Sequence, residues 1–299
     1  MSRVFAALDH GGRPILVCGH ERSGTNWILR TLGRAPGALC YLEPCLWYST
    51  PGASESVQAS YLRTGQPAPH FERALDGAFA GLTVPSRIWR ARSPKLLRRA
   101  LPGHRVVVKE VNTLMSIEWV ADRYDPLVVI PVRHPCPVVL SQLDRGVYAR
   151  GWLDVLAADD RLMADHLEPY RPVLTGATTP VAATAALWAA RNRVVADQLG
   201  DHPDWRVAVY EDLARDPIGG FRALYDGLGL RWTRRVERYV TRTTTTPDTA
   251  RFGTTRVSAD QIDGWRSSMT AAQIAEVREV TEVFDLPWYG ASDGAFDLD

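Results

Sequence analysis

A glycine-containing loop directly behind a short apolar run is the feature that most constrains the fold of this chain. The run is Ile15-Leu16-Val17-Cys18, and the loop reads Gly19-His20-Glu21-Arg22-Ser23-Gly24-Thr25-Asn26. Two glycines at this spacing, after a strand and before a helix, are typical of a loop whose backbone N–H groups bind phosphate. ATP-binding loops continue with Lys and then Ser or Thr, for the phosphates and Mg²⁺. Thr25 and Asn26 hold those positions here, so we expect a phosphate-bearing nucleotide without triphosphate–magnesium chemistry.

Further apolar runs and helical patterns alternate along the chain. The predicted strands cover residues 13–19, 105–109, 127–133 and 205–210. The predicted helices cover about 24–33, 136–146, 181–199, 216–227 and 271–284. Strands that alternate with helices favour an α/β fold of three layers, α/β/α, around a central, mostly parallel sheet. Ligands of such sheets bind at the carboxyl ends of the strands.

Composition narrows the class of protein. The formal net charge of +1 argues against a general nucleic-acid binder. No long apolar run and no basic leader occur, so we expect a cytoplasmic protein without stable membrane insertion. The four cysteines are scattered, which predicts buried, reduced thiols. The carboxylates and histidines do not occur at the spacing of metal ligands, so we expect no metal site.

We expect one domain over residues 1–299, with acceptor or lid insertions at about 50–103, 147–180 and 241–258. Solvated surface loops are the alternative for the first and last of these stretches. The basic run 87–99 suits either an anionic acceptor or a solvated amphipathic helix. Exposed loops of this kind could also serve a homo-oligomer interface.

Four further motifs are candidates for a functional site. They are Tyr41-Leu42-Glu43-Pro44 with Trp47, Arg133-His134-Pro135 with Ser141, Tyr210-Glu211-Asp212-Leu213 with Asp216-Pro217, and Gly264-Trp265-Arg266.

Together with Arg22-Ser23-Gly24-Thr25, these motifs resemble the sulfotransferases that use 3′-phosphoadenosine 5′-phosphosulfate (PAPS). The segment around Glu43 resembles the carbohydrate-directed branch of that family. The resemblance extends from about residue 13 to 285 and implies a P-loop-nucleotide-hydrolase-like fold. It also implies transfer of a sulfuryl group to a hydroxyl of a carbohydrate, glycolipid or glycosylated small molecule, without a metal and with adenosine 3′,5′-bisphosphate (PAP) as product.

The same resemblance implies the donor site. Its members would be Arg22, Ser23, Gly24, Thr25, Asn26 and Trp27 at the loop, Arg133 and Ser141 at the 3′-phosphate, and Tyr210, Arg251 and Arg256 further along the chain. The forked donors of an arginine suit two anionic oxygens at once. Core packing is the alternative for Trp27 and Tyr210, and pairing with a carboxylate is the alternative for Arg133.

Glu43 is the candidate general base, because the acceptor hydroxyl must lose a proton as it attacks sulfur. Cytosolic members of the family use a histidine shortly after a lysine on the second strand. Here that place reads Lys109-Glu110-Val111-Asn112. Glu110 is therefore a substitute base, and Lys109 is a candidate stabiliser of the leaving oxygen. For His20 we expect a role in orienting the loop.

Two other functions stay open. A P-loop kinase-like phosphotransferase would need Mg²⁺ and substitutes for the missing residues, for which Lys109 and Asp212 are available. A non-catalytic module could bind an adenosine bisphosphate and hold a partner with its surface loops.

Overall fold

Five parallel strands form one central sheet. The computed structural model describes residues 11–47, 61–81, 103–146, 149–245, 260–289 and 296. The strands are β1 (Ile15–Val17), β2 (Ala38–Leu42), β3 (Arg105–Lys109), β4 (Leu127–Val132) and β5 (Arg206–Val209). Their order is β2-β3-β1-β4-β5, with every neighbouring pair parallel. The predicted α/β class and parallel sheet are confirmed.

Strand β2 was missing from the sequence prediction. It carries only five residues, Ala38–Leu42, and its backbone pairs with all of β3, from Ala38 opposite Arg105 to Leu42 opposite Lys109. Its sequence, Ala-Leu-Cys-Tyr-Leu, lacks the run of β-branched residues that marks β3 and β4, so its pairing with β3 defines it as a strand. The consequence is that Glu43 directly follows one strand while Lys109 ends its neighbour.

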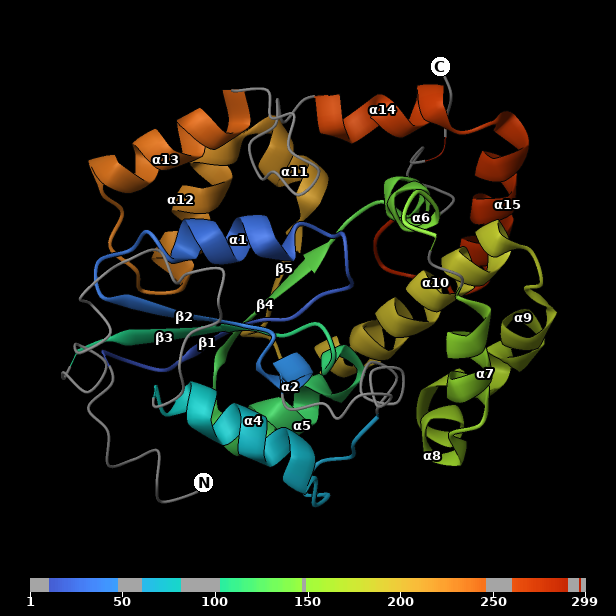
Figure 1. The fold of residues 1–299 in the computed structure, drawn as a ribbon, viewed down its shortest axis with the longest axis horizontal. Coiled ribbons are helices and arrows are strands. Elements are labelled where there is room, and N and C mark those ends of the chain that lie inside the picture. Colours follow the sequence, from blue (N-terminus) through green and yellow to red (C-terminus); the bar gives the residue numbers. More distant parts are fainter. Residues whose placement is uncertain are drawn as a thin grey trace.

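Helices cover both faces of the sheet, because alternate side chains of each strand point to opposite sides. Ile15, Val17 and Val107 face α1 (Thr25–Leu32), α12 (Pro217–Gly227) and α13 (Arg234–Thr245). Leu16, Val106 and Val108 face the layer of α4 (Pro69–Phe79), α5 (Ile117–Tyr124) and α10 (Pro180–Leu199). Figure 1 shows the sheet between α1 with α12 and α13 on one side and α4 with α5 on the other.

The remaining helices lie around these layers. They are α2 (Pro44–Trp47), η3 (Leu114–Ser116), α6 (Pro135–Leu143), α7 (Arg150–Ala157), α8 (Asp160–Leu162), η4 (Met163–Leu167), η5 (Glu168–Tyr170), α9 (Arg171–Gly176), α11 (Tyr210–Arg215), α14 (Asp260–Ser268) and α15 (Ala271–Glu282). A third apolar cluster joins α6, α10, α14 and α15. Within the described ranges, none of these helices combines the length and apolar character needed to cross a bilayer. All four cysteines are buried free thiols, as expected.

The predicted insertions contain more regular structure than their composition indicated. Residues 61–81 hold α4, which buries Phe71, Leu75 and Phe79 against the sheet. Their helical spacing was the signal available in the sequence, and the surrounding Pro and Gly obscured it. Residues 150–176 fold as short helices, several of which contact α10, and residues 241–245 end α13 rather than begin a loop. The basic run 87–99 lies outside the described residues.

Candidate functional site

The glycine loop leaves the carboxyl end of β1, the central strand, and leads into α1. Gly19 lies so close to β4 that a Cβ there would be 2.6 Å from the Pro131 carbonyl oxygen. Gly24, the N-cap of α1, has φ +84°, and a Cβ would be 2.7 Å from the Tyr210 ring. Both glycines are therefore required by geometry, the second for its left-handed backbone as well as for space.

The loop presents polar groups to a buried position. Ser23 is 1% exposed, and among the described residues its Oγ has no hydrogen-bond partner. The first N–H groups of α1 follow immediately, and such groups have no partner within their own helix. Thr25 is buried, whereas Asn26 is exposed. A buried hydroxyl beside a helix start is a polar environment that suits an anion.

Arg22 joins this loop to the Arg133–Ser141 motif. Its Nε donates to Ser141 Oγ at 2.7 Å, and Arg133 Nη1 donates to the Arg22 carbonyl oxygen at 3.2 Å. Helix α6 begins at Pro135, so Arg133 lies in the turn before it and Ser141 lies within it. Arg22 and Ser141 are 119 positions apart in the sequence, yet their contact joins the two motifs into one cluster at the carboxyl edge of the sheet.

Aromatic rings border the cluster. The Arg133 guanidinium carbon lies 4.2 Å from the centre of the Tyr210 ring. Trp27 meets Tyr210 edge to face at 5.7 Å and Phe221 at 4.9 Å. Tyr210 is the first residue of α11 and is half-buried, whereas Trp27 is buried. The ring of Tyr210 thus lies between the Arg133 guanidinium and the Trp27 ring.

Glu43 and Lys109 form an ion pair at the ends of β2 and β3. Lys109 Nζ contacts Glu43 Oε1, and the Glu43 N–H donates to the Lys109 carbonyl oxygen at 2.7 Å. The Lys109 side chain is 3% exposed, whereas that of Glu43 is 23% exposed. A carboxylate that water can still reach, held by a buried cation, is a group able to accept a proton from a bound molecule.

Glu110 differs from Glu43 in its surroundings. Its side chain is fully buried and accepts hydrogen bonds from the Cys45 N–H and the Asn112 N–H, each at 2.9 Å, and from Asn112 Nδ2. Burial raises the pKa of Glu110, and the charge of Glu43 raises it further, against the lowering effect of these donors.

A profile of the sulfotransferase family matches residues 14–234 of the chain. The protein belongs to the sulfotransferase family. The matched range contains the loop, the Glu43–Lys109 pair, the Arg133–Ser141 motif and Tyr210. No curated protein matches the chain.

Solved sulfotransferases are among the structures similar to this chain. The sulfotransferase domain from the curacin biosynthetic pathway is 14% identical, with a TM-score of 0.50 over 92% of this chain and 98% of that one. The domain from the Synechococcus PCC 7002 olefin synthase is 18% identical, with a TM-score of 0.48 over 94% and 98%. Mouse SULT7A1, complexed with PAP, is 15% identical, with a TM-score of 0.47 over 99% and 93%. At 14% identity, the likeness to the curacin-pathway domain concerns the fold alone.

His20 and Glu21 anchor the loop of this sulfotransferase. The His20 Nδ1–H donates to the Glu21 carbonyl oxygen at 2.9 Å, and burial lowers the pKa of His20 to about 4. Arg191 of α10, which the sequence did not single out, donates to Glu21 Oε2 at 2.8 Å. Burial opposes ionisation of Glu21, but Arg191 and His20 bring its net pKa below the ordinary value. The geometry agrees with an orienting role for His20.

The turn that carries Arg133 is supported by residues from the C-terminal part of the sulfotransferase. His134 stacks on Trp265 with ring centres 4.7 Å apart. Glu211 accepts from the His134 N–H at 3.2 Å and from the Tyr289 hydroxyl. Burial raises the pKa of Glu211. Tyr289 was not predicted, because no local pattern indicates a partner 78 positions away.

One candidate residue does not join the site. Asp212, which a kinase-like mechanism would have needed, points to solvent and pairs with Arg215 at 2.9 Å. Arg251 and Arg256 lie outside the described residues, as does the side chain of Trp47.

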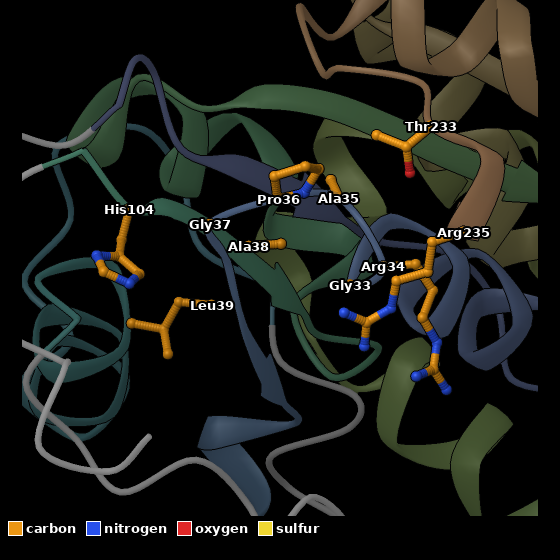
Figure 2. A pocket seen from close by; sticks show the side chains of 10 residues that line it. All are labelled: Gly33, Arg34, Ala35, Pro36, Gly37, Ala38, Leu39, His104, Thr233 and Arg235. Atoms are coloured by element: carbon orange, nitrogen blue, oxygen red, sulfur yellow. The ribbon is translucent and has the colours of Figure 1, made fainter. Parts of the chain in front are cut away.

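A cavity of about 320 Å³ lies at the opposite edge of the sheet, near the amino ends of β2 and β3 (Figure 2). It is formed where α1 ends and β2 begins, with Arg34, His104, Thr233 and Arg235 as its polar side chains. The glycine loop and the Glu43–Lys109 pair lie at the opposite, carboxyl ends of the strands, so this cavity is separate from the site described above.

Proposed function

We propose that this sulfotransferase moves the sulfuryl group of PAPS to a hydroxyl of a carbohydrate, glycolipid or glycosylated small molecule. The observation that carries the proposal is the contact between Arg22 and Ser141, at 2.7 Å. It joins the motif that resembles a 5′-phosphosulfate loop to the motif that resembles a 3′-phosphate site. A donor with phosphates at both positions matches such a pair of neighbouring cationic and hydroxyl groups.

The loop residues fit the donor. Ser23 Oγ, buried and without a partner among the described residues, would donate to the 5′-phosphosulfate. Arg22 and the N–H groups of Gly24, Thr25 and Asn26 would complete that anion site. This arrangement supplies positive potential without the lysine of an ATP-binding loop.

The adenosine 3′-phosphate part of the donor would bind at the Arg133–Ser141 motif. Arg133 and Ser141 would hold the 3′-phosphate, and Trp27 with Tyr210 would border the adenine. Arg251 and Arg256 remain proposed contacts to the 3′-phosphate from the late segment. PAPS supplies the activated sulfuryl group, whose bond to the phosphate oxygen breaks in the reaction.

Glu43 and Lys109 would act on the two oxygens that flank the transferred group. The acceptor oxygen forms a bond to sulfur and gives its proton to a Glu43 carboxylate oxygen. The S–O bond to the 5′-phosphate breaks, PAP keeps the electron pair, and Lys109 with Arg22 stabilises the charge that develops there. The ion pair supports this assignment, because it holds a carboxylate and an ammonium group next to each other at the end of the sheet where the donor would bind.

The acceptor class rests on the resemblance of Tyr41-Leu42-Glu43-Pro44 to the carbohydrate-directed branch. Transfer of radiolabelled sulfur from PAPS to a panel of sugars, glycolipids and phenols would test it. A panel in which only phenols are sulfated would contradict the carbohydrate proposal while leaving the donor proposal intact.

Donor identity is tested first by thermal shift. PAP is expected to raise the melting temperature with or without a chelator, since a ligand that binds only the folded state stabilises it. ATP with Mg²⁺ is the comparison. Stabilisation by ATP and Mg²⁺ alone would contradict PAPS use and favour a phosphotransferase.

Glu43→Gln tests the base. We expect kcat to fall about 10²- to 10⁴-fold, with PAP affinity unchanged, because the amide cannot accept the proton. Glu118→Gln, on α5 and paired with His202, is the matched control. Full turnover by Glu43→Gln would refute its role as base.

A further inference from the structure

We propose that Glu110 is a positioning residue, a buried carboxylate that holds the Glu43 turn in the geometry needed for proton transfer. The inference rests on the proposed function, in which Glu43 is the base. It assigns to Glu110 a task different from that of a substitute base.

The Glu43 turn needs support from outside itself. Glu43 lies between the end of β2 at Leu42 and the start of α2 at Pro44, with φ +48°. A residue other than glycine in this left-handed region is strained by about 1 kcal/mol or more. The turn therefore persists only where neighbouring groups hold it.

Two consecutive residues at the end of β3 supply the support. The Lys109 carbonyl oxygen accepts from the Glu43 N–H at 2.7 Å, and Glu110 Oε2 accepts from the Cys45 N–H at 2.9 Å. The backbone is thus held at Glu43 and again two residues later. A shift of Glu110 would release the second point and let the Glu43 side chain move.

A carboxylate is the group that fits this position. Oε2 meets the N–H of Cys45, while Oε1 meets the N–H and Nδ2 of Asn112. Donors approach both oxygens, so a glutamine amide would turn its own N–H groups against one set of donors. The same contacts occupy the carboxylate and keep it from a bound acceptor, because Glu110 is fully buried.

Glu110 and Glu43 also interact through their charges. The charged or titratable groups that act on Glu110 and its neighbours are Glu43, Lys109, Glu21, Cys18 and Cys45. Burial raises the pKa of both thiols, so Cys18 and Cys45 are neutral. The negative charge of Glu43 raises the pKa of Glu110, in addition to the larger effect of burial.

Hydrogen exchange of the 43–47 backbone tests the positioning without any acceptor. Loss of the bond from the Cys45 N–H is expected to speed its exchange about tenfold in Glu110→Gln, and more in Glu110→Ala. The Glu118→Gln control should leave this segment unchanged. Unchanged exchange at Cys45 in both Glu110 variants would overturn the proposal.

Comparison of kcat with PAP affinity then distinguishes a positioning role of Glu110 from a general loss of folding. In Glu110→Gln we expect kcat to fall about 10- to 100-fold while PAP affinity stays near that of the wild type. A positioning role thus predicts a loss in kcat that is not matched by a loss of PAP binding. A kcat equal to that of the wild type, or a loss of PAP affinity as large as the loss in kcat, would contradict the inference.

The parallel Glu43→Gln variant keeps the two proposals apart. Full activity in Glu43→Gln would refute the base, and with it the proposed mechanism. Reduced activity in Glu43→Gln but wild-type activity in Glu110→Gln would refute only the role of Glu110.

Discussion

Arg22 is the residue at which the separate parts of the site meet. Its backbone belongs to the glycine loop, its carbonyl oxygen accepts from Arg133, and its guanidinium donates to Ser141. Arg22 also has φ +71°, a left-handed conformation that is unusual for a residue with a side chain. This local geometry directs one side chain toward a helix that lies far away in the sequence.

Single replacements of Arg22 and Ser141 should show how much a charged side chain and a hydroxyl each contribute to PAP binding. Arg22→Ala is expected to weaken PAP binding about 10- to 100-fold, because it removes a charge-assisted donor, and Ser141→Ala about 2- to 10-fold. Calorimetric titration with PAP measures both. Arg161→Ala, an exposed arginine on α8, is the control. Equal affinity for PAP in Arg22→Ala and the wild type would contradict the donor site.

His20 is expected to make the fold sensitive to acid. Its pKa is lowered to about 4 by burial, so the folded state favours the neutral ring. The stability linked to this group is present above about pH 6.5 and is lost as the pH falls toward 4, by up to about 3 kcal/mol. Urea unfolding of His20→Gln should show a weaker loss over this range. The exposed His70→Gln is the control, and an identical pH dependence in His20→Gln and the wild type would refute the role of His20.

At the scale of elements, the site depends on where strands end and helices begin. The loop follows β1, Glu43 follows β2, Lys109 ends β3 and Arg133 follows β4. Parallel strands bring all four positions to one edge of the sheet, and the order β2-β3-β1-β4 makes them neighbours. The chemistry is therefore distributed over four elements that no local pattern connects.

The junction of the loop and α1 should not tolerate a side chain at Gly24. Gly24→Ala is expected to cost about 1 to 3 kcal/mol, because alanine is strained at φ +84° and its Cβ would clash with Tyr210. PAP binding should weaken as well. Gly151→Ala, in open space within α7, should instead stabilise by about 0.5 to 1 kcal/mol. Thermal unfolding of both variants checks this, and a stable Gly24→Ala that binds PAP normally would contradict it.

Across the molecule, an ion pair between the buried Arg191 and the partly exposed Glu21 links the loop to α10. Arg191 is 3% exposed, donates to Glu21 at 2.8 Å and lies 5.8 Å from the Trp152 ring of α7. The contact joins the centre of the sheet to the helical layer built by residues 150–199. Loop geometry and helix packing are thereby coupled.

Breaking this pair should destabilise the entire fold. Arg191→Met is expected to cost about 3 kcal/mol, because it leaves the Glu21 carboxylate without its buried partner. The double variant Arg191→Met with Glu21→Gln should recover part of that loss. Arg278→Met, in a solvent-exposed pair with Glu282, should change stability by less than about 1 kcal/mol. Urea unfolding measures all three variants, and equal effects of Arg191→Met and Arg278→Met would contradict the expectation.

Local sequence patterns account for the glycine loop, four of the strands, five of the helices and the family resemblance. These follow from residue type, spacing and periodicity, which act over a few positions. Tertiary structure alone decided the rest, including β2, the Glu43–Lys109 pair across 66 positions and the anchoring of Glu21 by Arg191 across 170. It also distinguished Glu43, which solvent reaches, from Glu110, which three donors surround. Those contacts depend on which strands become neighbours, and strand order is set by the packing of the whole chain rather than by any segment of it.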